Sequence, residues 1–101
     1  MQVPDAFPPH ALAVVHPDHL STRLGDEIVI LGLRDSVYYG LSGTGAHIWE
    51  LLQTRRSVQD LVALIVAEYE VTAEQAEADL QVLLADLHSR GLVEITTDDP
   101  R

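Results

Sequence analysis

The sequence predicts an α+β fold in which a small antiparallel sheet is followed by helices. Residues 19–41 hold three short segments of strand-like composition, separated by turn residues. From residue 42 onward, the spacing of apolar residues changes from period two to period 3.6. The 101 residues and the hydrophobic fraction of 47% suit one domain with one core. Because the strands precede the helices instead of alternating with them, we expect the helices to cover one face of the sheet.

Three strands are expected, at residues 19–24, 28–33 and 37–41. The first, HLSTRL, alternates apolar and polar residues, which is typical of a half-buried strand. The second, IVILGL, is almost continuously apolar and is therefore expected at the centre of the sheet. The third is VYYGL. The two turns, GDE and RDS, are short, so the strands should form an antiparallel meander.

Three helices are expected after the strands, beginning at the capping residues Ser42, Ser57 and Thr72. Asp60 and Gln75 lie three residues after the second and third caps, in capping-box positions. The third helix should run to about Arg90, since Gly91 suits the residue that follows a helix. Residues 92–95 are expected to form a short strand or an extended tail.

These elements define a domain at residues 19–95 between two other segments. Residues 1–18 contain four of the five prolines, so we expect an extended or loose N-terminal arm there. Residues 96–101, TTDDPR, should form a polar tail. Three strands and three helices of these lengths look like a winged-helix variant, with the first two helices forming a helix-turn-helix pair.

The charge argues against nucleic acid as a partner. Sixteen acidic residues face six arginines, for a formal net charge of −10. The second expected helix has no basic residue, and the third carries several acids before its only base, Arg90. Either helix would repel phosphates, so no nucleic acid is expected to bind despite the winged-helix pattern.

Several other classes of function are also not expected. The chain has no cysteine, the histidines lack metal-ligand spacing, and no serine lies in a nucleophile motif. We therefore expect no catalytic residues, no metal and no cofactor. The first residues lack the basic segment of a signal peptide, and no apolar run approaches the ~20 residues of a membrane helix. A cytoplasmic protein without membrane contact is expected.

Peptide binding is the hypothesis that fits these residues. If VYYGL is an edge strand, its lack of lysine and proline leaves it open to a further strand. The third helix would form the wall of the groove, because Asp79, Val82 and Asp86 form a second stripe beside its core-facing leucines. An apolar residue between two acids suits a peptide with apolar and lysine residues. The candidate peptide-binding residues are Val37, Tyr38, Tyr39, Gly40, Leu41, Asp79, Leu80, Val82, Leu83, Leu84, Asp86 and Leu87.

The aromatic residues near the third strand have separate expected roles. Strand alternation separates Val37, Tyr39 and Leu41 from Tyr38. We expect Tyr38 to be the exposed contact and Tyr39 to be half-buried. Trp49 is expected in the core, because large aromatic side chains dominate small cores.

An ordered set of residues carries a family resemblance over roughly residues 19–95. The set comprises Leu31 and Leu33, Tyr38-Tyr39-Gly40-Leu41, Ile48-Trp49 with Leu51-Leu52, Ser57, Tyr69, Asp79, and Arg90-Gly91-Leu92. In this set the chain resembles the PqqD-like family, the recognition elements for precursor peptides of ribosomal natural-product pathways. The family usually has Leu-Asn followed by proline at the strand-to-helix junction, where this chain has Leu41, Ser42 and Gly43.

The resemblance implies a small non-catalytic protein that binds the leader of a precursor peptide. It also implies that the leader pairs with the third strand, lies against the third helix and is delivered to a maturation enzyme. A separate chain of this size looks most like the leader-binding half of a split lasso-peptide system, whose other members would be a leader-cleaving cysteine protease and a cyclase. The alternatives are a peptide chaperone of another pathway, such as pyrroloquinoline quinone biosynthesis, or a self-associating winged-helix interaction domain. A monomer or a weak homodimer is expected.

Overall fold

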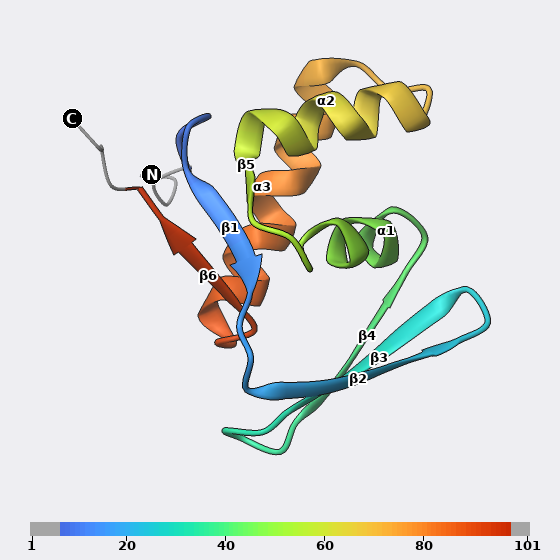
Figure 1. The fold of residues 1–101 in the computed structure, drawn as a ribbon. Coiled ribbons are helices and arrows are strands. Elements are labelled where there is room, and N and C mark those ends of the chain that lie inside the picture. Colours follow the sequence, from blue (N-terminus) through green and yellow to red (C-terminus); the bar gives the residue numbers. More distant parts are fainter. Residues whose placement is uncertain (1–6, 98–101) are drawn as a thin grey trace, which may run out of the picture.

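The structure, a computed structural model, describes residues 7–97. These residues form three helices and two separate three-stranded antiparallel sheets (Figure 1). The elements are β1 (Leu12–Val15), β2 (His19–Leu24), β3 (Glu27–Gly32), β4 (Tyr38–Ser42), α1 (Gly43–Leu51), β5 (Arg56–Ser57), α2 (Val58–Glu68), α3 (Ala73–Ser89) and β6 (Val93–Thr96). The α+β class is confirmed, with more strands than the sequence predicts.

The first sheet is the expected meander, in the order β2-β3-β4. Gly25, with φ of +63°, makes the tight turn between β2 and β3. On β3, Ile28 and Ile30 face the core, whereas Val29 and Leu31 lie on the opposite face and are half-buried. The sheet therefore has one face against the helices and one outer face.

The second sheet, in the order β5-β1-β6, was not predicted. Its central strand β1 lies within the expected N-terminal arm and pairs with β6 along its whole length, from Leu12–Thr96 to Val15–Val93. Residues 12–15 of the expected arm are extended, as one of the two alternatives had it, but they form a paired strand of the domain. The expected short strand after α3 is present as β6. The arm and tail predicted at residues 1–6 and 98–101 lie outside the described residues.

The helix caps agree with the sequence at two positions and differ at one. The Ser57 and Thr72 hydroxyls accept hydrogen bonds from the N–H groups of Asp60 and Gln75, at 3.1 and 3.0 Å. Ser42 precedes α1 but makes no side-chain cap bond. Instead, the chain enters α1 through Gly43, whose φ of +58° is incompatible with the proline usual in the family.

The last turn of α3 ends in a Schellman motif, which fixes the direction in which the chain leaves the helix. Gly91 has φ of +74°. The N–H groups of Gly91 and Leu92 donate to the carbonyls of His88 and Leu87, at 3.0 and 2.9 Å. This turn leads directly into β6, so that β6 packs beside α3 (Figure 1).

One hydrophobic core joins the two sheets and the helices. Its largest fully buried side chains include Trp49, Ile30, Leu61 and Leu80. The expected burial of Trp49 is thereby confirmed. Among the helices of residues 7–97, none is long and apolar enough to cross a membrane. The same residues hold no group of three potential metal ligands.

Candidate functional site: the outer edge of β4

Strand β4 is the outer strand of its sheet, and half of its backbone groups face away from β3. The N–H of Gly32 donates to the carbonyl of Val37 at 3.0 Å, which identifies Gly32–Val37 as a hydrogen-bonded pair. Along an antiparallel ladder, hydrogen-bonded residue pairs alternate with non-hydrogen-bonded pairs. Given the register of β3 and β4, the backbone groups of Tyr38, Gly40 and Ser42 therefore point toward the free edge.

The side chains of β4 divide between the two faces as expected. Tyr38 is 70% exposed and lies on the outer face. Tyr39 is half-buried and packs against the core, and Leu41 is buried. The predicted exposure of both tyrosines is thus confirmed. Val37, just before the strand, is exposed and lies on the same side as Tyr39.

The side chain of Tyr39 connects β4 to the last turns of α3. Its hydroxyl donates a hydrogen bond to the carboxylate of Asp86. The guanidinium of Arg90 lies 4.4 Å from the centroid of the Tyr39 ring, in cation–π contact, and its Nε is 3.2 Å from the Asp86 carboxylate. Asp86 is therefore already paired, and these three residues bridge the strand and the helix.

A small hollow lies beside this bridge, between the start of β4 and the end of α3. It is lined by Gly32, Asp35, Val37, Tyr39, Arg90 and Leu92. Its volume of about 10 Å³ has room for about one water molecule. A larger side chain enters this hollow only if Tyr39 or Arg90 moves.

The candidate residues of α3 differ greatly in accessibility. Asp79 and Val82 are exposed, Val82 by 72%. Leu83 and Asp86 are partly accessible. In contrast, Leu80, Leu84 and Leu87 are fully buried, as is most of Leu41. These four residues position the strand and the helix, and in this conformation they offer no surface to a peptide.

Arg90 is a residue of this site that was not among the candidates from the sequence. It lies four residues after Asp86, on the same side of α3, and that spacing was the available signal. Its contact with Tyr39 depends on the approach of β4 to α3 in the folded chain, which the spacing alone does not predict.

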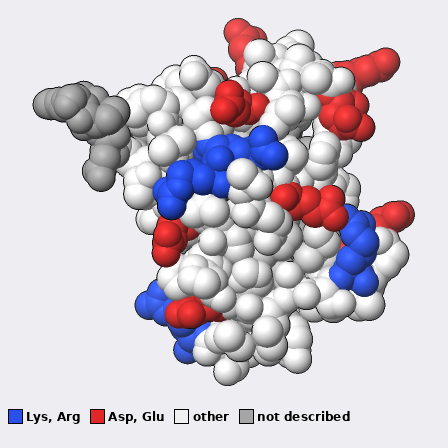
Figure 2. Space-filling view, viewed as in Figure 1, with Lys and Arg blue, Asp and Glu red and all other residues white. Residues whose placement is uncertain are grey.

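Acidic and basic side chains are mixed on the face of the molecule that Figure 2 shows. The blue side chains form separate groups with red neighbours, and a broad white area lies between them. This face has no continuous cationic surface of the kind that follows a phosphate backbone.

The comparisons with known proteins agree with the sequence resemblance. The family model described as Coenzyme PQQ synthesis protein D (PqqD) matches residues 27–93, more than half of the chain. The chain belongs to the PqqD family. The expected family is thereby confirmed, and the match extends from the first residue of β3 to the first residue of β6.

Two solved structures are similar to this PqqD-family chain. One is "TbiB1 in Complex with the TbiA(beta) Leader Peptide", with 33% identity and a TM-score of 0.77, covering 84% of this chain and 99% of that chain. The other is "Lasso peptide synthetase B1 complexed with the leader peptide", with 27% identity and a TM-score of 0.72, covering 81% of this chain and 96% of that one. A search of the curated proteins finds no match.

Proposed function

We propose that this protein binds the leader of a ribosomally made precursor peptide and performs no chemistry itself. The observation that supports this most strongly is the open edge of β4 beside α3, in a chain similar to two proteins that were each solved with a leader peptide. Both of those proteins match this chain over at least four-fifths of its length.

In this proposal the leader binds as an additional strand on β4. The outward backbone groups of Tyr38, Gly40 and Ser42 supply the ladder hydrogen bonds, which set register and affinity. The strand carries neither the lysine nor the proline that commonly protects an edge. Side chains of the leader would alternate between the outer face and the space next to α3.

The accessible part of α3 selects among leader sequences. Val82 and Leu83 provide apolar contact, and Asp79 provides a carboxylate for a lysine or arginine of the leader. Gln75 donates to the Asp79 carboxylate at 3.0 Å and orients it. Because Asp86 is paired with Tyr39 and Arg90, the preference for a basic residue rests mainly on Asp79.

The bound leader is then delivered to a maturation enzyme in the cytoplasm. The similarity to a lasso peptide synthetase B1 favours a lasso-peptide pathway, with a leader-cleaving cysteine protease and a cyclase as further partners. The family description favours pyrroloquinoline quinone biosynthesis as the second candidate pathway.

A titration with a labelled synthetic leader tests strand addition directly. The leader is taken from a precursor encoded beside this protein, and fluorescence anisotropy reports binding. Gly40→Pro removes an outward N–H without touching the β3 ladder, so it should weaken binding about tenfold or more. Gly40→Ala is the matched control, since its new Cβ meets only the movable Glu27 carboxylate, at 3.3 Å.

The outcomes separate the function from the binding mode. Tight binding by the parent protein and by Gly40→Ala, with loss in Gly40→Pro, supports both. Equal affinity of all three proteins would contradict strand addition on β4 while leaving leader binding intact. No binding by the parent to leaders of either candidate pathway would contradict the proposed function.

A further inference from the structure

Strand β2 is the second outer strand of the first sheet, and its edge is also open. The N–H of Leu33 donates to the carbonyl of Asp18 at 3.2 Å, which sets the alternation of the β2–β3 ladder. In the register of β2 and β3, the backbone groups of His19, Ser21 and Arg23 therefore point away from β3. Every residue of β2 after His19 is exposed.

Residues 20–24 of β2 are nearly symmetric about Thr22. In LSTRL, Leu20 and Leu24 flank Thr22 at equal distances, and all three side chains lie on the outer face of the sheet. The leucines are 61% and 60% exposed. An antiparallel partner with the same sequence, related by a two-fold axis at Thr22, would place leucine opposite leucine and threonine opposite threonine. Such cross-strand pairs are favourable.

The backbone alternation is compatible with this register. The backbone groups of Thr22 point toward β3. With the axis at Thr22, the two copies of Thr22 therefore face each other as a non-hydrogen-bonded pair. Ser21 then lies opposite Arg23 of the other copy, and both of these residues have backbone groups directed at the free edge. Two Ser21–Arg23 pairs complete a short ladder on either side of the axis.

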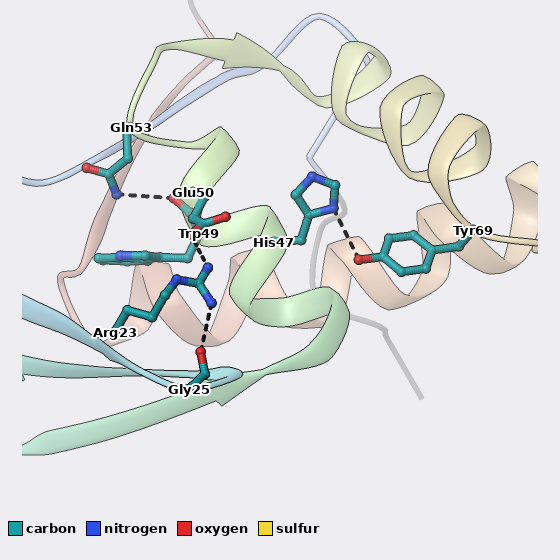
Figure 3. A network of polar contacts seen from close by, with 7 residues as sticks. All are labelled: Arg23, Gly25, His47, Trp49, Glu50, Gln53 and Tyr69. Atoms are coloured by element: carbon teal, nitrogen blue, oxygen red, sulfur yellow. Dashed lines mark hydrogen bonds and ion pairs between the residues drawn. The ribbon is translucent and has the colours of Figure 1, made fainter.

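The inner side of the β2 edge has room for the second strand. Figure 3 shows Arg23 of β2 bonded to Glu50 of α1 and to the carbonyl of Gly25, the latter at 3.1 Å. Beside this ion pair lies a hollow of about 180 Å³. It is lined by Ser21, Thr22, Arg23, Ile28, Trp49, Glu50 and Gln53. The side chains of Ser21 and Arg23 from a second strand would lie at this hollow.

The charges along β2 are compatible with self-pairing despite the net charge of −10. Arg23 is the only Arg, Lys, Asp or Glu residue of β2, and it is neutralised by Glu50. In the two-fold register Arg23 faces Ser21 of the other copy, so no like charges lie opposite each other within β2. The remaining repulsion between two acidic chains is long-range and is screened by salt.

We propose that two copies of this chain associate through β2, forming a six-stranded sheet with β4 at both outer edges. This arrangement leaves each β4 free, so it is independent of whether β4 binds a leader. It differs from self-association through β4, which would occupy the candidate site.

Because the chain has no cysteine, a single introduced thiol reports the register. Non-hydrogen-bonded antiparallel pairs have Cα atoms about 4.5 Å apart, within the range of a disulfide. Thr22→Cys should therefore give a covalent dimer on mild oxidation at micromolar concentration. Leu20→Cys is the matched control, since the two copies of residue 20 are offset by about 13 Å along the strand. We expect at least tenfold slower cross-linking for the control.

A second measurement does not depend on a thiol. Ser21→Pro removes an outward N–H of β2, and Ser21→Ala keeps it. Sedimentation velocity of the parent should show a mass that rises with concentration and with salt, unchanged in Ser21→Ala and monomeric in Ser21→Pro. Circular dichroism checks that each variant is folded.

Three results would overturn the proposal. The first is equal cross-linking of Thr22→Cys and Leu20→Cys. The second is faster cross-linking of a Gly40→Cys variant than of Thr22→Cys, which would locate the contact at β4. The third is a parent protein that stays monomeric at all concentrations and salt levels.

Discussion

The hydroxyl of Tyr39 makes a hydrogen bond that connects two elements far apart in the sequence. It donates to Asp86, and Arg90 covers the ring. The carboxyl side chain of Asp86 is 42% exposed, so water competes for it and its bonds are worth less than in a buried site. The contact therefore holds β4 near α3 without making the bridge rigid.

We predict that Tyr39 and Asp86 are energetically coupled. Tyr39→Phe keeps the ring under Arg90 and removes only the hydroxyl. A double-mutant cycle with Asp86→Ala, which removes the acceptor, should give a coupling energy of about 1 kcal/mol, below the roughly 1.5–3 kcal/mol of a bond to a charged group, because the pair is partly exposed. Urea denaturation of the four proteins measures it. A coupling energy indistinguishable from zero would show that the bond does not persist in solution.

At the residue scale, sequence reasoning succeeded for the aromatic residues. It placed Tyr38 outside, Tyr39 half inside and Trp49 in the core. The alternation of residues 19–24 predicted a half-buried strand, and this was wrong, since Leu20 and Leu24 are 61% and 60% exposed. Sequence reasoning also failed for Arg90 and for the cap at Ser42. Both of these depend on details of the folded chain: the approach of β4 to α3, and the left-handed backbone of Gly43.

One face of helix α3 is buried and the other is exposed, so only some of its candidate residues are accessible to a peptide. Leu80, Leu84 and Leu87 belong to the core, whereas Val82 projects from the surface. The sequence predicted a core-facing stripe and an accessible stripe on this helix, but a leucine at the boundary between them can lie on either one. The periodicity of α3 therefore predicts the helix well and its accessible residues less well.

We predict that Leu84→Ala mainly lowers stability, whereas Val82→Ala mainly lowers leader affinity. Leu84→Ala should lower the free energy of unfolding by about 2–5 kcal/mol, because it leaves a cavity in the core. Val82→Ala should change it by less than about 0.5 kcal/mol. In the proposed function, only Val82→Ala weakens the leader affinity of the folded protein. Urea denaturation and anisotropy titration measure the two quantities. Equal stability losses would contradict the separation of the faces.

At the scale of the molecule, the second sheet is the part that the sequence did not predict. Strands β1, β5 and β6 have only four, two and four residues, too few for a clear alternation. Each of these strands is extended because it pairs with a strand distant in the sequence. The four prolines near β1, taken without those partners, predict an N-terminal arm. The local pattern therefore predicted the first sheet and the helices, but not the strands that join the two ends.

We predict that β1 is essential for the stability of the whole domain. Ala13 is fully buried between β5 and β6, so Ala13→Asp would bury a charge and should cost more than about 3 kcal/mol. The neighbouring Leu12 is 38% exposed, and Leu12→Asp should cost much less. Thermal denaturation of both variants checks this. Similar melting temperatures would indicate that β1 is detached from the domain in solution.

The pairing of β1 with β6 also decides how the domain responds to mechanical force. Leu12, at the start of β1, lies opposite Thr96, at the end of β6. Force applied at these two residues acts across the ladder, parallel to its hydrogen bonds, and loads one pair at a time. The ladder therefore opens like a zipper from Leu12–Thr96 toward Val15–Val93. The domain should yield at low force from this direction, with β2, β3 and β4 separating only after β1 has been peeled away.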